Sequence, residues 1–362
     1  MEHWLPLCLS SFLVEDQRLA QLEVLVVNDG SHDRTGDIAR EYAKRYPCVF
    51  RVIDKPNGNY GSCINAALPL VKGYYVKIVD ADDRVDTEIF SRFLAELEEE
   101  RSFGASAADL VLTDAVPVFP DGGIGQWGRT NYPYGRGLSL PDSSVSYVQF
   151  GLFAITFRTA IFHGLGYRQT EGISYTDMEW IIEPMVHVRH VSRYPLVVVK
   201  HLVGRPGQTT ESQAKIAAHF SDYERIALDM ISHYDRFAAE CDHLALSYYK
   251  SQLLQLLLSI FEKGLFGMGN GIQVQVDLRS IDHAIRASRQ LFLETEQAAI
   301  WSRWFPIRLI RAWRRHPGLG TPLLYAYRIF LSIKRIYYKW NIRCLKRCCA
   351  CANDGQSNGR LH

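Results

Sequence analysis

Two short apolar runs, each ending in acidic residues, constrain the fold of this chain most. The run Glu23–Val27 is rich in β-branched residues and stops at the turn signal Asn28–Asp29–Gly30–Ser31. The run Tyr74–Val79 stops in the same way at Asp80–Ala81–Asp82–Asp83. Runs of this kind are typical of parallel-sheet strands buried on both faces. We therefore expect a strand at each run, with Glu23–Val27 buried on both faces.

Helical segments are expected to separate these strands. The spacing predicts a helix around Ile38–Tyr46, a strand at Phe50–Ile53 and a short helix at Ile64–Leu68 that is stopped by a proline. Strands that alternate with helices predict an α/β domain with a mostly parallel sheet. Ligands of such sheets bind at the carboxyl ends of the strands, where Asp29 and Asp80 fall.

The residues Asp80, Asp82 and Asp83 point to metal chemistry. Three carboxylates at one strand end repel one another unless a cation lies between them. Mg²⁺ prefers a few carboxylate oxygens together with water and substrate phosphates, and a metal there would neutralise a departing diphosphate. The alternative is a solvated acidic turn that caps the next helix. Asp29 could accept the imide N–H of uracil or a ribose hydroxyl, although an ordinary turn explains it equally well.

Several ordered motifs together resemble the family-two glycosyltransferases with the GT-A fold. The resemblance covers roughly residues 1–210 and implies a Rossmann-like domain, a UDP-sugar donor, Mn²⁺ or Mg²⁺, and inversion at the anomeric carbon. It is carried by VVNDGSHDRT at 26–35, Asn57–Gly58 with Asn65 downstream, DADD at 80–83, SYTDMEW at 174–180, and LVGRPGQT at 202–209.

Residue roles follow from this resemblance. The nucleotide sugar would be bound by Asp29, Asn57, Asp80 and Arg205, with Gln208 beside Arg205, and Asp82 would ligate the metal.

On the acceptor side, Asp177 would be the general base that takes the proton of the acceptor hydroxyl. We expect nearby Glu179 to raise the proton affinity of Asp177. The alternative for Asp177 is a helix N-cap, with Met178 and Trp180 in the core.

The resemblance favours transfer of one sugar to a lipid-linked or polysaccharide acceptor. A processive synthase is disfavoured because the sequence holds no Gln-x-x-Arg-Trp segment and no apolar run long enough to span a membrane. One rival is an aspartyl phosphatase, which also uses an Asp-x-Asp strand end. The family normally opens with an apolar strand that grips the nucleotide, and Met1–Leu13 corresponds to the helix after it. A second rival is therefore a catalytically impaired, membrane-associated partner protein with an incomplete donor site.

The remaining chain divides by composition into a helical region at 211–300 and a basic aromatic tail at 301–362. Residues 301–350 carry twelve Lys or Arg and no acid, whereas 28 basic and 38 acidic residues lie in positions 1–300. Tryptophan and tyrosine interleave with these cations, which favours an anionic membrane surface over nucleic acid. The alternative is a helical pair packed on the domain. Since no signal peptide is visible, we expect a cytoplasmic protein attached peripherally to the inner face of the cell membrane.

The cysteines and histidines are expected to be structural. Four cysteines are isolated, which suits a reducing compartment. Cys344, Cys348, Cys349 and Cys351 lack the paired spacing of a zinc site and are expected to be free thiols. The three histidines His187, His190 and His201 are expected to be structural or to face solvent.

Overall fold

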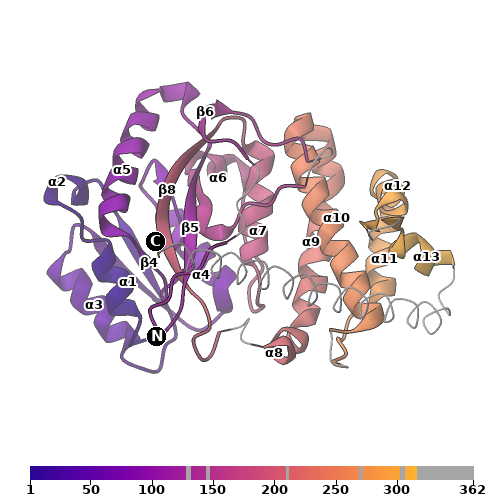
Figure 1. The fold of residues 1–362 in the computed structure, drawn as a ribbon, viewed down its shortest axis with the longest axis horizontal. Helices are drawn as coiled ribbons and strands as arrows, with labels where there is room; N and C mark the ends of the chain where they lie inside the picture. The colour runs from indigo at the N-terminus through magenta and orange to yellow at the C-terminus, as the bar shows by residue number, and fades with distance from the viewer. Residues whose placement is uncertain (128–131, 144–146, 209–211, 269–271, 302–305, 316–362) are drawn as a thin grey trace, which may run out of the picture.

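The computed structural model describes residues 1–127, 132–143, 147–208, 212–268, 272–301 and 306–315. An α/β part comes first along the chain, and a row of helices stands beside it (Figure 1). The predicted α/β class with C-terminal helices is confirmed.

The first part of the chain forms a small parallel sheet with its own helices. Its elements are α1 (Leu5–Ser11), α2 (Asp16–Leu19), β1 (Val24–Asp29), α3 (Thr35–Arg45), β2 (Phe50–Lys55), α4 (Asn59–Ala67) and the 3₁₀ turn η1 (Leu68–Leu70). The strands β1 and β2 pair in parallel, from Val24 opposite Phe50 to Asp29 opposite Lys55. The helix expected at 64–68 begins earlier, at Asn59, and Pro69 falls in the 3₁₀ turn that follows it.

The expectation that the strand at Glu23–Val27 is buried on both faces was wrong. Every residue of β1 is only half-buried. The reason lies in the pairing, because β1 has β2 as its one partner among the described strands and the two form a sheet of their own. The second run is also shorter than predicted, since only Tyr75–Val76 forms a ladder as β3.

The larger sheet is mixed rather than mostly parallel. Its order is β3-β7-β5-β8-β4, with β6 paired to β8. Only β5 and β8 run in parallel, and the other described pairs are antiparallel. Besides β3, it is formed by β4 (Arg84–Val85), β5 (Leu110–Val118), β6 (Gly135–Leu138), β7 (Ile155–Arg158) and β8 (Val191–Leu202). Residues 115–118 thus form the end of β5, and residues 135–138 form β6.

Helices and 3₁₀ turns connect these strands. They are α5 (Thr87–Ser102), η2 (Gly104–Ser106), η3 (Leu152–Ala154), α6 (Ala160–Leu165), α7 (Asp177–Ile182) and η4 (Glu183–His187). Helix α5 begins at a side-chain cap, in which Asp86 accepts a hydrogen bond from the backbone N–H of Ile89.

The hydrophobic core has two parts. The boundary between them differs from the division of the chain that composition predicts. One part joins α1, α3 and α5 to the inner face of β8. The other extends from β5 and α7 through the C-terminal helices as far as Ile310. Trp180 of α7 is 1% exposed in this second part. The helical region is therefore continuous with the α/β part, because the two bury one common set of side chains.

The C-terminal elements are α8 (Gln213–Ala218), α9 (Phe220–Glu240), α10 (His243–Phe266), α11 (Leu278–Ala287), α12 (Arg289–Gln297), β9 (Ile300–Trp301), β10 (Pro306–Ile307) and α13 (Leu309–Arg315). The predicted helical region is thus present. Helix α13 is the described beginning of the basic tail, and it lies against the other helices with Leu309 and Ile310 buried. Arg314 of this helix pairs with Asp282 and Glu296.

The predictions for residues 316–362, including membrane contact and the state of the four clustered cysteines, lie outside the described residues. None of the helices in the described ranges is both long and apolar enough to cross a membrane. The isolated cysteines Cys8, Cys48, Cys63 and Cys241 are free thiols, as expected.

Candidate active site

Asp29 is held at the end of β1 by partners from the neighbouring strand and loop. Its carboxylate accepts hydrogen bonds from Lys55 Nζ at 2.5 Å and from the backbone N–H of Gly58 at 3.0 Å. Asn57 donates its side-chain amide to the Asp29 carbonyl at 3.2 Å. Gly30 has φ +70°, and a Cβ there would lie 2.9 Å from the Asn57 nitrogen, so the two loops require glycine at this approach. The structure therefore brings the predicted donor residues Asp29 and Asn57 together.

Two side chains, those of His201 and Arg205, contact carboxylates of the acidic cluster at 80–83. Asp83 is 1% exposed, accepts the Leu202 N–H at 2.8 Å, and lies 2.9 Å from Nδ1 of His201. The Nε–H of Arg205 donates to the Asp82 carboxylate. The end of β8 and the segment after it thus supply partners for two of the three acids. Arg205 is placed beside the predicted metal ligand, and Gln208 bonds to the backbone of Leu202 and Gly204 instead.

The pKa of Asp80 is strongly perturbed, and the charge of His201 only partly opposes the rise. Burial raises the pKa of Asp80 to about 7, and the charges of Asp83, Asp82 and Asp177 add to the effect. Tyr60 of α4 lies beside Asp80 and Asp177, and its pKa is raised well above the ordinary value, mainly by burial. Since α4 follows directly after Asn57–Gly58, this helix links the Asp29 group to the acidic cluster.

Asp177 is the first residue of α7 and faces the same acidic cluster. Burial raises the pKa of its carboxyl, while its own backbone N–H and that of Met178 oppose the rise. The alternative that Asp177 is the helix N-cap was wrong, because Thr176 is the N-cap residue of α7 and Asp177 is the first residue of the helix itself. Two residues earlier, Tyr175 has φ +64° and stacks on Tyr223 with ring centroids 4.5 Å apart. A non-glycine residue in this conformation stores strain, which is common where a loop positions reactive groups.

Glu179 does not perturb Asp177 as expected. Its side chain is 1% exposed and turns into the core, where one oxygen accepts the Thr170 N–H at 2.8 Å. Burial raises the pKa of Glu179 itself to about 7. Because residues i and i+2 of a helix point in different directions, the two carboxyls face different surroundings.

Several residues of this site were missed or assigned differently from the sequence. His201 was expected to be structural or solvent-facing, yet it contacts the acidic cluster; its place directly before the segment at 202–209 was a usable signal. Lys55 and Tyr60 carried no signal by themselves, since pairing of β1 with β2 and the start of α4 bring them into place.

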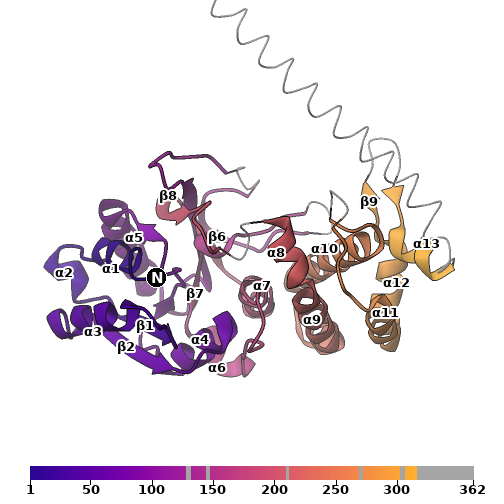
Figure 2. The same cartoon turned by 90° about the horizontal axis from the view of Figure 1, so that it is seen from below.

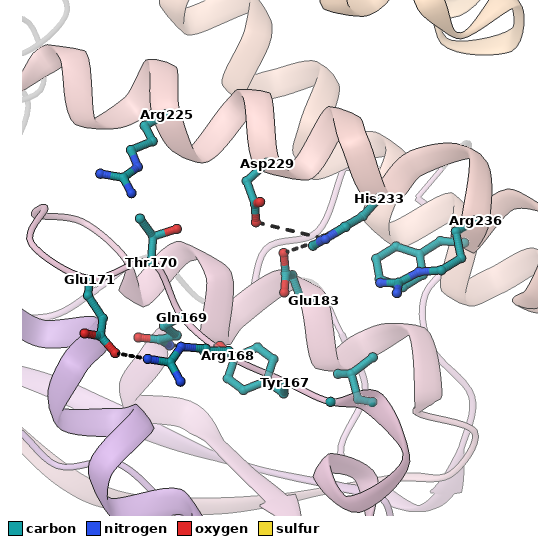
Figure 3. A pocket seen from close by; sticks show the side chains of 13 residues that line it. Tyr167, Arg168, Gln169, Thr170, Glu171, Glu183, Arg225, Asp229, His233 and Arg236 are labelled. Carbon is teal, nitrogen blue, oxygen red and sulfur yellow. Dashed lines mark hydrogen bonds and ion pairs between the residues drawn. The ribbon is translucent and has the colours of Figure 1, made fainter.

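A second polar group lies apart from this site (Figure 3). Glu183, Asp229 and His233 offer ligand atoms within 4.8 Å of one another and could hold a metal ion. His233 Nδ1 lies 3.3 Å from Glu183, and Asp229 and His233 come from the same helix, α9. They border a cavity of about 500 Å³ that is also lined by the loop 165–171. None of these three residues was predicted as a metal ligand, and the group contains no member of the acidic cluster.

Comparison with known proteins identifies the class of this site and fold. Residues 2–136 match the model of glycosyl transferase family 2. Over 101 residues the chain is 38% identical to the glycosyltransferase EpsJ of Bacillus subtilis, which is 28% of each chain. Over 122 residues it is 32% identical to the chondroitin synthase of Pasteurella multocida, which is 34% of this chain and 12% of that one. The chain thus matches about a third or less of the length of these relatives.

Solved structures are similar over more of the chain. The structure of S. aureus TarS residues 1–349 with UDP-GlcNAc has a TM-score of 0.54 at 19% identity, and covers 80% of this chain and 77% of that one. The structure of S. aureus TarS has a TM-score of 0.57 at 18% identity, over 88% of this chain and 51% of that one. The fold is therefore that of the GT-A glycosyltransferases. The N-terminal part of this chain is a family 2 glycosyltransferase domain.

Proposed function

We propose that the protein transfers one sugar from a nucleotide sugar, with UDP as the nucleotide, to a lipid-linked or glycan acceptor with inversion. The observation that carries the proposal is the meeting of Asp80, Asp82 and Asp177 in one buried acidic cluster, beside Arg205. A donor diphosphate, a divalent cation and an acceptor hydroxyl need these groups together, because the reaction is an in-line displacement with charge developing on the leaving group.

The residues on the donor side suit a nucleotide. Asp29 and the backbone around Asn57 and Gly58 form a polar edge at the end of β1. Lys55 neutralises Asp29 in the structure, so a nucleoside would meet a paired carboxylate that still has acceptor capacity. The TarS structure with UDP-GlcNAc supports a UDP-sugar, since the two chains share the fold.

The acidic cluster suits a divalent cation. Asp82 and Asp80 offer carboxylate oxygens, which are the donors that Mn²⁺ and Mg²⁺ take. The pKa of Asp80 is raised mainly by burial and further by the neighbouring acids. When bound, the ion would neutralise charge on the leaving diphosphate. Arg205 would bind the diphosphate from the other side. Asp177, whose pKa is raised by burial, would accept the proton of the acceptor hydroxyl.

Attachment to the cytoplasmic face of an anionic membrane through residues 301–350 belongs to the same proposal. It would bring the domain to a lipid-linked acceptor. The described helix of this segment, α13, already pairs Arg311 and Arg314 with the acids of α11 and α12. Arg308 and Arg315 are exposed, and the other cations available to a membrane would come from residues after Arg315.

A panel of UDP-, GDP- and dTDP-sugars, each with Mn²⁺, Mg²⁺ or EDTA, tests this function through donor hydrolysis without acceptor. We expect metal-dependent hydrolysis of a UDP-sugar, and a loss of about 10²-fold or more in Asp82→Asn. Asp37→Asn on the exposed face of α3 is the matched control and should retain activity. Hydrolysis that stays at the wild-type level both with EDTA and in Asp82→Asn would contradict the metal assignment.

A second candidate, a partner protein with an incomplete donor site, is favoured by the separation of the β1–β2 sheet from the larger sheet. The same experiment separates the two candidates. Absence of hydrolysis for every donor, together with calorimetry that detects no UDP binding, would support the second candidate.

A further inference from the structure

Beside the acidic cluster lies a group of three rings, Trp127, Phe153 and His201, which we call the aromatic platform. Phe153 and His201 are stacked, with centroids 4.0 Å apart and an interplanar angle of 28°. The Trp127 ring lies 5.3 Å from Phe153 and 5.5 Å from His201. Trp127 is nevertheless 41% exposed. An exposed indole in contact with two other rings offers a flat apolar surface of the kind that binding sites use.

The platform is continuous with the acidic cluster through His201. Nδ1 of His201 lies 2.9 Å from the Asp83 carboxylate, and Asp83 is one of the charges that raise the pKa of Asp80. An occupant of the platform would therefore lie next to the groups that we assign to catalysis.

Other contacts fix the platform in place before any ligand arrives. Lys77 is half-buried and lies two residues before Val79. Its Nζ donates hydrogen bonds to the carbonyl of Phe153 at 2.6 Å and to that of Ile155 at 3.2 Å. Trp127 comes two residues after a closed turn, in which Gly125 N–H donates to Pro117 O at 2.9 Å. A pre-formed surface of this kind loses little conformational entropy on binding.

The platform belongs to the larger sheet, apart from the Asp29 group that we assign to the nucleotide. The Asp29 group belongs to the β1–β2 sheet, whereas His201 ends β8 and Phe153 precedes β7 in the larger sheet. Figure 2 shows β8 on the opposite side of the α/β part from β1 and β2. A diphosphate bound beside Arg205 would leave the platform for the molecule that supplies the attacking hydroxyl.

We infer that Trp127, with Phe153 and His201 behind it, stacks on a hexopyranose ring of the acceptor glycan. The C–H face of such a ring is apolar and flat, whereas its rim of hydroxyls can reach a polar group such as the His201 ring, whose side chain is 19% exposed. The inference rests on the proposed glycosyltransferase function and adds to it a subsite for a sugar ring next to the accepting one.

Binding of soluble tetrasaccharides, followed by saturation-transfer NMR and calorimetry, tests the inference without turnover. The probes are a neutral hexose tetramer, an N-acetylglucosamine tetramer and a chondroitin tetrasaccharide. We expect at least one to bind the full chain, with affinity reduced about tenfold in Trp127→Ala and less in Trp127→Phe. Phe119→Ala is the matched control, because Phe119 is 42% exposed in the same loop and makes no ring contact with Phe153 or His201 among the described residues.

A second measurement separates this inference from the proposed function. Acceptor-independent hydrolysis of the UDP-sugar should be the same in wild type, Trp127→Ala and Phe119→Ala. Loss of hydrolysis in Trp127→Ala would assign Trp127 to the donor site and overturn the inference, as would equal tetrasaccharide binding by both variants or none by the wild type. Absence of hydrolysis in the wild type, with tetrasaccharide binding intact, would contradict the function and leave the subsite supported.

Discussion

The Nε–H of Arg205 donates to the carboxylate of Asp82, so the residue predicted to hold the metal is paired with a cation of the same chain. Both residues are largely buried, with 16% and 9% of their side chains exposed. A buried carboxylate requires a counter-charge. In the proposed mechanism the metal and Arg205 therefore compete for the carboxylate oxygens of Asp82 until a bound diphosphate draws Arg205 away.

Arg205→Ala should separate these two roles. Without donor, Mn²⁺ should bind more tightly than in wild type, because Asp82 has lost its competing partner. The KM for the UDP-sugar should rise about tenfold or more, since a charged hydrogen bond to the diphosphate is lost. Calorimetry measures the first effect and initial rates measure the second. Arg45→Ala, an exposed arginine at the end of α3, serves as control; a metal affinity that falls in Arg205→Ala would refute the competition.

Asp177→Asn should abolish transfer while UDP-sugar binding stays close to that of wild type. The substitution removes the proton acceptor and keeps the size of the side chain, so it damages the acceptor side alone. Measurement of kcat with saturating donor, beside donor affinity by calorimetry, gives both numbers. A collapse of donor affinity would instead place Asp177 in the nucleotide site or in the support of α7.

Glu179 should make the protein less stable as the pH rises. Its folded-state pKa is raised to about 7 from an ordinary 4.5, so the folded protein keeps a proton that the unfolded chain releases in this window. Its contribution to the free energy of unfolding is therefore lost between about pH 4.5 and 7. Glu179→Gln removes this contribution and should flatten the decline. Denaturant unfolding at pH 5 and pH 8 checks it, with Glu41→Gln on the exposed face of α3 as control; identical pH slopes in Glu179→Gln and wild type would contradict the assignment.

Residues after Arg315 should be required for attachment to anionic vesicles. We expect the full chain to float with liposomes that contain phosphatidylserine and to lose this binding when it ends at Arg315. Truncation after α13 preserves the pairing of Arg314 with Asp282 and Glu296. The binding should weaken with salt, because it depends on screened charges. Equal binding to neutral vesicles, or no change on truncation, would exclude this role.

The sequence alone determined the local features of the site. A β-branched run that stops at Asn-Asp-Gly-Ser placed Asp29 at a strand end, because strand periodicity and turn chemistry act over a few residues. The same local logic placed Asp80 and Asp82 after a strand run, whereas the role of Asp177 came from the resemblance to the family. The change from an apolar run to the acidic residues at 80–83 is a short-range pattern that can be read directly from the sequence.

Only the tertiary structure decided which of these residues meet. His201 is 118 residues from Asp83, and Arg205 is 123 from Asp82, yet antiparallel pairing of β8 with β4 and folding of the next loop join them. The burial of β1 was mispredicted for the same reason, since burial depends on which strands lie alongside. The side chains of Glu179 and Asp177 point in different directions, because α7 begins at Asp177 and the helical geometry then sets the direction of each side chain. Strand order, register and side-chain direction are long-range consequences of packing, and no local pattern encodes them.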